Sequence, residues 1–242
     1  MVESLYGVKE ETKIILVYIE HFGDEIEKVS LEMLSKGREL ADQVGWKLVG
    51  LLLGRDVAKH ADVVFVHGAD KVILVEHNLL DNFTVDAYSH AVFQVLLSDL
   101  PSIFLLGATA NGRDLAGRLA VRLKTGLNAD CTDLRLDLET GVLICEVSGF
   151  GSGVLALIDI PNHRPQMATV RPGVFAIKET YRNRRGDVVD YEVDLHKEVI
   201  RTRILKQVIG KEVDLSSVPV IIAGGRGVSG DYKMLSKLAD LL

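Results

Sequence analysis

The chain has 242 residues, 48% of them hydrophobic and 26% charged, so it can bury a sizeable core and is typical of globular rather than disordered proteins. Its net charge of −6 argues against a general affinity for nucleic acids or anionic membranes, which are bound through clustered Lys and Arg. No apolar run could span a bilayer, and residues 1–12 resemble neither a signal peptide nor a transit peptide, so we expect a cytoplasmic protein.

The first half of the chain alternates apolar, β-rich runs with helical patterns. Residues 13–19 predict a buried first strand, and the helix after it keeps its apolar residues from Ile26 to Val44 on one stripe and ends at Gly45. Further strands are expected at 47–53, 71–75 and 102–106, with helices around 57–66, 84–97 and 112–124. This alternation is typical of parallel βαβ units, so we predict an open, mostly parallel α/β sheet with helices on both faces.

From Asp133 onward the pattern changes to short alternating strands. Four runs, at 134–138, 142–147, 154–160 and 166–171, predict hairpin-like strands added to one end of the sheet, with a hairpin turn over 149–153. Two more strands are expected at 188–195 and 201–208. The polar stretch 210–219 then predicts a linker, and 220–223 restarts the strand-then-helix pattern of a new domain.

The two cysteines, Cys131 and Cys145, limit the choice of redox centre. They do not form a C-x-x-C pair, so the sequence offers neither a zinc ribbon nor a four-thiolate iron–sulfur cluster. Any redox centre must therefore be an organic cofactor, and both cysteines are expected to be small buried hydrophobes.

Two turns place glycines and an arginine between an apolar strand and a helix, where backbone N–H groups and the helix dipole favour an anion. The first is G-A-T-A-N-G-R-D-L-A-G-R-L-A-V-R-L-K-T-G-L-N-A-D-C at 107–131, in which we expect Asn111 to cap the helix and Asp114 to pair with Arg118. The second is V-I-I-A-G-G-R-G at 220–227. Its glycines let backbone approach a pyrophosphate, and Arg226 offers a planar fork for phosphate or a ring carbonyl.

Three stretches together resemble the α subunit of electron transfer flavoproteins. They are the first turn at 107–131, the run H-R-P-Q-M-A-T-V-R-P-G-V-F at 163–175, and A-G-G-R-G at 223–227. The resemblance implies an adenine-nucleotide α-hydrolase-like N-terminal domain over 1–210, without its own cofactor, and the beginning of a FAD-binding α/β domain over 211–242. That second domain is expected to be incomplete, because chains of this family continue further. The sequence departs from the family at Val147-Ser148 and Ser152-Gly153, which replace its usual Arg-Pro and Gly-Gly-Asn.

The resemblance also implies a function. The chain would pair with a β subunit, carry FAD, and pass electrons from flavin dehydrogenases, such as the acyl-CoA dehydrogenases of fatty acid β-oxidation, to a membrane quinone reductase or another acceptor. It would be a carrier without catalytic residues. Gly224, Gly225, Arg226 and Gly227 would bind FAD, and Arg113, Arg164 and Arg171 would face the partner subunit. Three alternatives stay open: an electron-bifurcating form using NADH and a second flavin, a stand-alone adenine-nucleotide-binding module that uses the Gly107 turn, and a truncated structural subunit.

Overall fold

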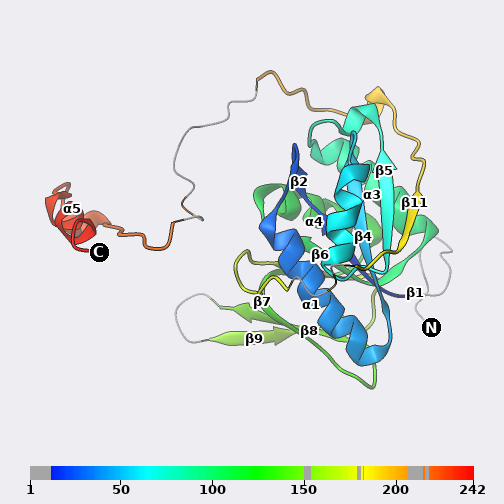
Figure 1. The fold of residues 1–242 in the computed structure, drawn as a ribbon, viewed down its shortest axis with the longest axis horizontal. Coiled ribbons are helices and arrows are strands. Elements are labelled where there is room, and N and C mark those ends of the chain that lie inside the picture. Colours follow the sequence, from blue (N-terminus) through cyan, green and yellow to red (C-terminus); the bar gives the residue numbers. More distant parts are fainter. Residues whose placement is uncertain (1–11, 150–153, 179–180, 182, 207–214, 216–217) are drawn as a thin grey trace. The chain divides into compact units, whose positions relative to one another are not determined.

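The computed structural model describes residues 12–149, 154–178, 181, 183–206, 215 and 218–242. The chain divides into two compact units, Met1–Thr202 and Arg203–Leu242 (Figure 1). The turn predicted over 149–153 and the linker predicted over 210–219 lie mostly outside the described residues.

The N-terminal unit is built on one nine-stranded sheet with the strand order β11-β5-β4-β1-β6-β10-β7-β8-β9. All neighbours from β11 to β7 pair in parallel, and β8 and β9 continue the sheet antiparallel. A separate small hairpin joins β2 (His21–Phe22) to β3 (Glu25–Ile26). The strands of the large sheet are β1 (Thr12–Ile19), β4 (Lys47–Gly54), β5 (Lys71–Glu76), β6 (Pro101–Gly107), β7 (Leu127–Leu136), β8 (Leu143–Ser148), β9 (Leu155–Ile158), β10 (Gln166–Val170) and β11 (Asp187–Asp190). The predicted open α/β sheet is therefore confirmed.

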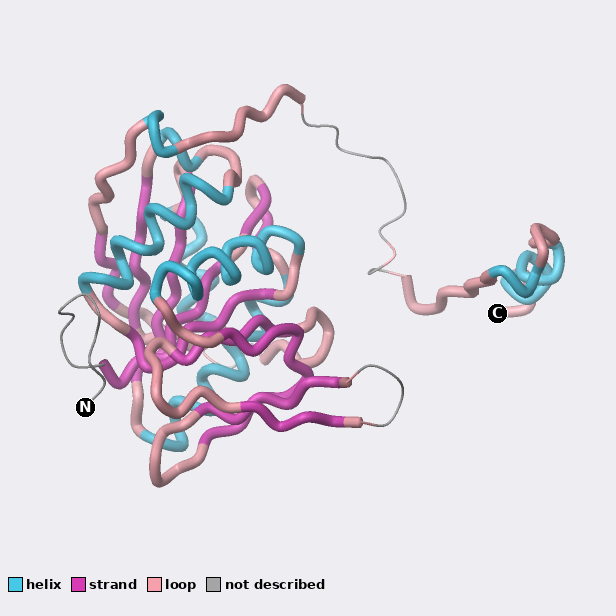
Figure 2. The backbone as a smooth tube through the Cα atoms, turned by 180° about the vertical axis from the view of Figure 1, so that it is seen from behind, coloured by secondary structure: helices cyan, strands magenta, loops and turns pink. Residues whose placement is uncertain are grey.

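Helices cover both faces of this sheet, and the alternation of side chains along β1 explains why. Ile15, Val17 and Ile19 enter a core beneath α1 (Lys28–Val44) and α2 (Ala61–Val66), whereas Leu16 and Tyr18 enter a second core beneath α3 (Val85–Ser98) and α4 (Ala110–Leu123). Figures 1 and 2, which view the molecule from opposite sides, each show helices in front of the strands. Single 3₁₀ turns lie at Ala58–His60, Asn78–Leu80 and Lys197–Val199.

The end of α1 matches the sequence prediction closely. Gly45 adopts the left-handed conformation, with φ 66°, and its N–H donates to the carbonyl of Ala41. A residue with a side chain is strained in this conformation, so glycine is the residue that ends the helix here.

The position of β10 corrects the sequence prediction. Instead of joining a row of hairpins, β10 lies in parallel between β6 and β7, with Met167 opposite both Phe104 and Leu127. All five of its residues are buried. A strand covered on both faces and flanked on both edges is typical of the middle of a parallel sheet, so only β8 and β9 form the expected antiparallel addition.

The strands predicted at 188–195 and 201–208 are also largely wrong. Only Asp187–Asp190 forms a strand, β11, and it pairs with β5 at the sheet edge. After Tyr191 the chain leaves that edge and crosses α3, and residues 201–206 form no strand. Hydrogen bonds to Gln94 on α3 hold the backbone away from the sheet.

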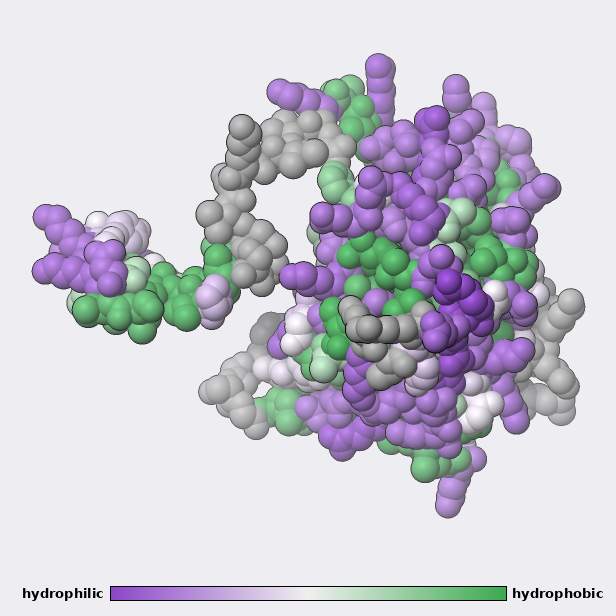
Figure 3. Space-filling model, viewed as in Figure 1, coloured by the Kyte–Doolittle hydropathy of each residue, from purple (hydrophilic) through white to green (hydrophobic). Residues whose placement is uncertain are grey.

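The C-terminal unit contains a 3₁₀ turn at Arg226–Val228 and a short helix, α5 (Lys233–Ala239). Residues 220–223 form no strand, because the described part of this unit supplies no neighbouring strand to complete a ladder. Several of its apolar side chains are exposed (Val220, Ile221, Met234, Leu238, Leu241 and Leu242). Figure 3 shows hydrophobic surface gathered along one side of this unit. None of the helices in the described ranges is both long and apolar enough to cross a membrane.

Candidate functional site

The carboxyl ends of β1 and β6 form the point where the sheet changes direction. After β1 the chain adds β4 and β5 on one side, and then returns to add β6 on the other. In open α/β sheets ligands bind in the crevice beside such a point. The turn after β6, which the sequence predicted as an anion site, lies here.

Two glycines of this turn serve close packing. A Cβ on Gly107 would lie 2.5 Å from a methyl group of Val29 on α1, and one on Gly112 would lie 2.0 Å from the carbonyl oxygen of Gly107. The glycines therefore let α1, β6 and α4 approach one another. The helix is capped by Thr109, whose hydroxyl accepts from the Gly112 N–H at 2.9 Å, and not by Asn111 as the sequence predicted.

A carboxylate of the chain itself occupies the helix N-terminus. Glu20 follows β1, is 6% exposed, and accepts a hydrogen bond of 2.6 Å from the Thr109 hydroxyl. Burial raises the pKa of Glu20, and hydrogen bonds from Thr109 and Asn111 oppose that shift. A phosphate placed at this helix would meet a negative charge already bound there, so the geometry argues against a nucleotide-binding module that uses the Gly107 turn.

Arg113 and Arg171, which were predicted at a partner interface, share one carboxylate. Arg171 donates to one oxygen of Asp130 through two nitrogens at 3.2 and 2.7 Å, and Arg113 approaches the other oxygen at 3.4 Å. The hydrogen bond from Arg171 lowers the pKa of Asp130. Arg113 is exposed and Arg171 is half-buried, so both guanidinium groups remain partly accessible to solvent.

The backbone around this cluster is fixed at two points. Asp130 has φ +60°, a conformation that Asp and Asn tolerate better than most residues, at an irregularity in the pairing of β7 with β10. The buried carboxylate of Glu32 on α1 accepts from the Gly173 N–H, at 2.9 and 3.1 Å to its two oxygens, and so holds the loop after Arg171. The two guanidinium groups are therefore presented from a constrained backbone.

Arg164 lies apart from these two arginines. It precedes β10, whereas Arg171 follows it, so the strand separates them. Its guanidinium donates to the carbonyl oxygens of Ile160, Pro161 and His163 within its own loop. The structure thus brings together two of the three predicted interface arginines and places the third at the opposite end of a strand.

Arg118 does not bind Asp114, as its spacing suggested. Its guanidinium instead contacts Asp86 in the first turn of α3, and Asp86 also accepts from the backbone N–H of Arg201 at 3.1 Å. The residue spacing within α4 could not predict this contact, because Asp86 lies on another helix.

The predicted FAD ligands lie in the C-terminal unit. A Cβ on Gly224 would lie 2.5 Å from Leu235 on α5, so this glycine is needed for packing, whereas Gly225 and Gly227 have open space where a Cβ would stand. Arg226 is exposed. The turn therefore offers two unobstructed glycines and an accessible guanidinium.

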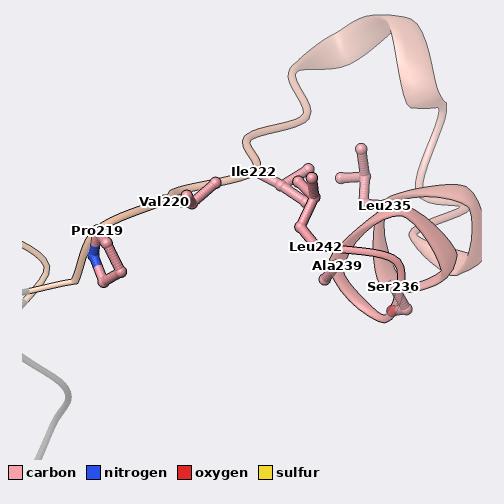
Figure 4. Close-up of a pocket in the computed structure, with 7 residues that line it drawn as sticks. All are labelled: Pro219, Val220, Ile222, Leu235, Ser236, Ala239 and Leu242. Atoms are coloured by element: carbon pink, nitrogen blue, oxygen red, sulfur yellow. The ribbon is translucent and has the colours of Figure 1, made fainter.

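An apolar cavity of about 480 Å³ lies beside this turn, lined by Pro219, Val220, Ile222, Leu235, Ser236, Ala239 and Leu242. Figure 4 shows Ile222, Leu235 and Leu242 close together on its apolar side. The prediction that both cysteines are buried is confirmed. Within the described part of the chain, no group of three or more His, Cys, Asp or Glu is placed to hold a metal.

Three carboxylates that organise these sites were missed by the sequence analysis: Glu20, Asp86 and Asp130. Glu20 had a usable signal, since it directly follows a buried strand whose carboxyl end borders the predicted site. Asp86 and Asp130 had none, because their partners lie on elements distant in sequence.

Comparisons with known proteins agree on one family. The family model described as "Electron transfer flavoprotein domain" matches residues 15–196. "Protein FixB" of Clostridium saccharobutylicum is 42% identical over 234 residues, which is 95% of this chain and 70% of the relative. "Electron transfer flavoprotein subunit alpha" of Clostridium acetobutylicum is 40% identical over 240 residues, 97% of this chain and 71% of the relative. "Acryloyl-CoA reductase electron transfer subunit beta" of Anaerotignum propionicum is 36% identical over 256 residues, 93% of this chain and 70% of the relative.

Proposed function

Because the chain belongs to the electron transfer flavoprotein domain family and is an electron transfer flavoprotein subunit, we propose that it is the α-type subunit and holds FAD through its C-terminal unit. The observation that carries this proposal is the Gly224–Gly227 turn, which follows the matched region and leaves an accessible arginine between two open glycines. The name of the Clostridium acetobutylicum relative, subunit alpha, supports the α assignment, although the Anaerotignum relative is named a β subunit.

The residues of this turn suit a flavin dinucleotide. Backbone at Gly225 and Gly227 can approach a pyrophosphate closely, because neither residue has a side chain and nothing lies within 4 Å of the position that a Cβ would take. Arg226 can donate two parallel hydrogen bonds to a phosphate or to a ring carbonyl. When bound, the flavin supplies the electron-carrying chemistry, and the chain's own task is to hold and orient it and to set the charge around it.

The N-terminal domain, proposed to span residues 1–210, would hold the partner subunit and no cofactor of its own. Glu20 supports this, since its carboxylate is hydrogen-bonded to Thr109 at the N-terminus of α4, where a second negative charge would be unfavourable. The cluster of Arg113, Asp130 and Arg171 is the proposed contact with a β-type subunit. Arg164 is proposed to make a second, separate contact with that subunit. The first compact unit ends at Thr202, a few residues before the proposed domain boundary.

Electrons would come from flavin dehydrogenases that act on acyl-CoA substrates and pass to a quinone reductase or another acceptor. The Anaerotignum relative supports a partner enzyme that acts on acyl-CoA substrates, because its name ties it to an acryloyl-CoA reductase, although a reductase takes up electrons and so stands on the acceptor side. We further propose that the complex works in the cytoplasm.

The experiment is co-expression with a β-type electron transfer flavoprotein subunit, followed by size-exclusion chromatography and an absorbance spectrum. A one-to-one complex with a flavin spectrum is expected when the α chain carries its whole FAD domain. Residues 1–242 alone should be nearly colourless, because one turn and one short helix cannot enclose a flavin. Separate elution of the two chains would contradict the proposed pairing, and stoichiometric FAD on residues 1–242 alone would place the flavin elsewhere.

A further inference from the structure

The N-terminal unit ends in a segment that is strapped across α3. This segment, residues 187–202, is called the strap. It begins as β11 on the sheet edge, and Tyr191 then donates its N–H to the carbonyl of Leu74 at 2.8 Å and its hydroxyl to the carbonyl of Gln94 at 3.0 Å. Leu195 is 4% exposed in the core beneath α3 and α4, and further apolar side chains of the strap pack against that core (Tyr191, Val193, Val199 and Ile200).

A pair of polar contacts holds the middle of the strap. The side-chain amide of Gln94 on α3 accepts from the Asp194 N–H and donates to the Asp194 carbonyl, both at 2.9 Å. His90, one turn earlier on α3, places its Nε2 3.1 Å from the same carbonyl. Gln94 therefore satisfies both backbone groups of Asp194 in the way a neighbouring strand would.

A buried carboxylate holds the end of the strap. Asp86, 8% exposed, divides its two oxygens: Oδ1 accepts from the Arg118 guanidinium, and Oδ2 accepts from the Arg201 N–H at 3.1 Å and lies 3.5 Å from the Thr202 hydroxyl. Burial alone would raise the pKa of Asp86, but the bonds from Arg118 and Arg201 outweigh it and lower that pKa. After Thr202 the compact unit ends, and residues 203–206 are exposed.

Stabilisation of α3 alone does not explain this arrangement. A carboxylate in the first turn favours a helix through the dipole, and Asp86 would do so with either oxygen. Here Oδ2 is committed to two groups of the strap, and a cation from α4 holds the carboxylate in the orientation that makes this possible. Charge-assisted bonds to a desolvated carboxylate are stronger than neutral ones, so the strap is held most firmly where it leaves the unit.

We propose that Asp86, oriented by Arg118, is the anchor that fixes Thr202 as the starting point of the tether to the C-terminal unit. Loss of this anchor frees the strap from its end backward, toward the Gln94 contacts. The tether then becomes longer, and the range of positions open to the C-terminal unit increases. Asp86 is thus a positioning residue that acts on the reach of the second unit, whether or not that unit carries a cofactor.

Limited trypsin digestion of the native full chain tests the anchor. Cleavage after Arg201 requires the end of the strap to leave Asp86, whereas the exposed Lys206 lies beyond the anchored residues, so the ratio of the two cleavage rates reports the anchor within one molecule. Asp86→Asn keeps the shape of the side chain and removes its charge. It should raise cleavage after Arg201 by about tenfold to a hundredfold, the range expected for a charge-assisted hydrogen bond, with little change after Lys206.

A distance measurement tests the effect on reach. Spin labels at Leu138→Cys, in the exposed β7–β8 turn, and at Lys237→Cys, on α5, should give a broader distance distribution when Asp86→Asn is introduced. Arg201→Pro provides a second route, because it removes the bonded N–H at an exposed position and leaves the Asp86–Arg118 pair in place. It should broaden the distribution as well.

Two controls separate the anchor from general loosening. Asp114→Asn changes an exposed carboxylate on α4, and Leu205→Ala changes an exposed side chain beyond the anchor. Neither should move the cleavage ratio or the distances. The proposal is overturned if Asp86→Asn leaves the ratio unchanged, if Arg201→Pro leaves the distribution unchanged, or if the controls have effects of equal size.

Discussion

The Thr109 hydroxyl links two functions at the start of α4: it donates to the Glu20 carboxylate at 2.6 Å and accepts from the N–H of Gly112 at 2.9 Å. One side chain thereby caps the helix and stabilises a buried negative charge at its N-terminus. Residues separated by 89 positions in sequence are joined in this way at the point where the sheet changes direction.

Glu20→Gln should change how stability depends on pH. Burial raises the pKa of Glu20 in the folded state, so the folded protein binds this proton more tightly than the unfolded chain does. The contribution of Glu20 to stability is therefore greatest below the ordinary glutamate pKa and declines as pH rises through the raised value. Gln does not titrate, so the variant should gain stability relative to the parent as pH rises. Urea denaturation at several pH values measures this, and a difference that stays constant would count against the buried charge.

Gly112→Ala and Gly117→Ala form a matched pair on α4. A Cβ at Gly112 would lie 2.0 Å from a backbone oxygen, and because that atom cannot move without shifting β6, the substitution should cost about 1–3 kcal/mol or more. At Gly117 nothing lies within 4 Å of an added Cβ, so alanine should stabilise the helix by roughly 0.5–1 kcal/mol. Thermal unfolding compares the two, and equal effects would refute the assignment of Gly112 to packing.

Arg113 and Arg171 should act together in binding the partner subunit, and Arg164 should act separately. The first two share Asp130, so the effects of their alanine variants on the dissociation constant should be non-additive by about 0.5–3 kcal/mol. Arg164→Ala combined with Arg171→Ala should be additive, because β10 separates the two residues. Isothermal titration with the β-type subunit decides between these outcomes. If none of the three variants weakens binding, the interface lies elsewhere.

Arg226→Ala should weaken FAD binding in the chain that carries the whole FAD domain. Hydrogen bonds from a charged donor contribute about 1.5–3 kcal/mol, which corresponds to roughly a tenfold to hundredfold loss of affinity. Arg226→Lys should recover only part of this, since an ammonium group cannot replace the planar fork. Flavin fluorescence titration gives the constants. Arg135→Ala is the suitable control, because Arg135 is exposed and binds only Asp133 and Glu146 among the described residues. Arg118 is unsuitable, since it holds Asp86.

The spacing of apolar residues and the helix-ending glycine were sufficient to predict the elements in the first half of the fold. The run at 13–19 and the glycine after α1 each carry a local signal, and both predictions are confirmed. The position of β10 was predicted wrongly because it depends on the strands that β10 pairs with. These are β6 and β7, which precede it in the sequence and leave room for a parallel strand between them. The strand predicted over 188–195 failed for a similar reason, since Gln94 on α3 competes for its backbone groups.

In the candidate sites too, features with a local sequence signal were predicted, and contacts between residues distant in sequence were not. Glycines and arginines at the two turns were recognisable in sequence, but the carboxylates that orient the arginines were not. Arg118 illustrates this: its spacing from Asp114 predicts a contact along one helix, whereas the folded chain offers Asp86 at the junction of two helices and the strap.

The insertion of β10 between β6 and β7 has a consequence for how the protein is made. A ribosome releases β6 and β7 well before β10, so until residue 170 has emerged the two strands cannot be joined into one sheet. Each exposes an unpaired edge during that interval, and such edges are templates for pairing with other chains. Nascent chains that stall between residues 136 and 170 should therefore be the ones most dependent on chaperones, and β6 and β7 should be joined into one sheet in a single late step when β10 enters between them.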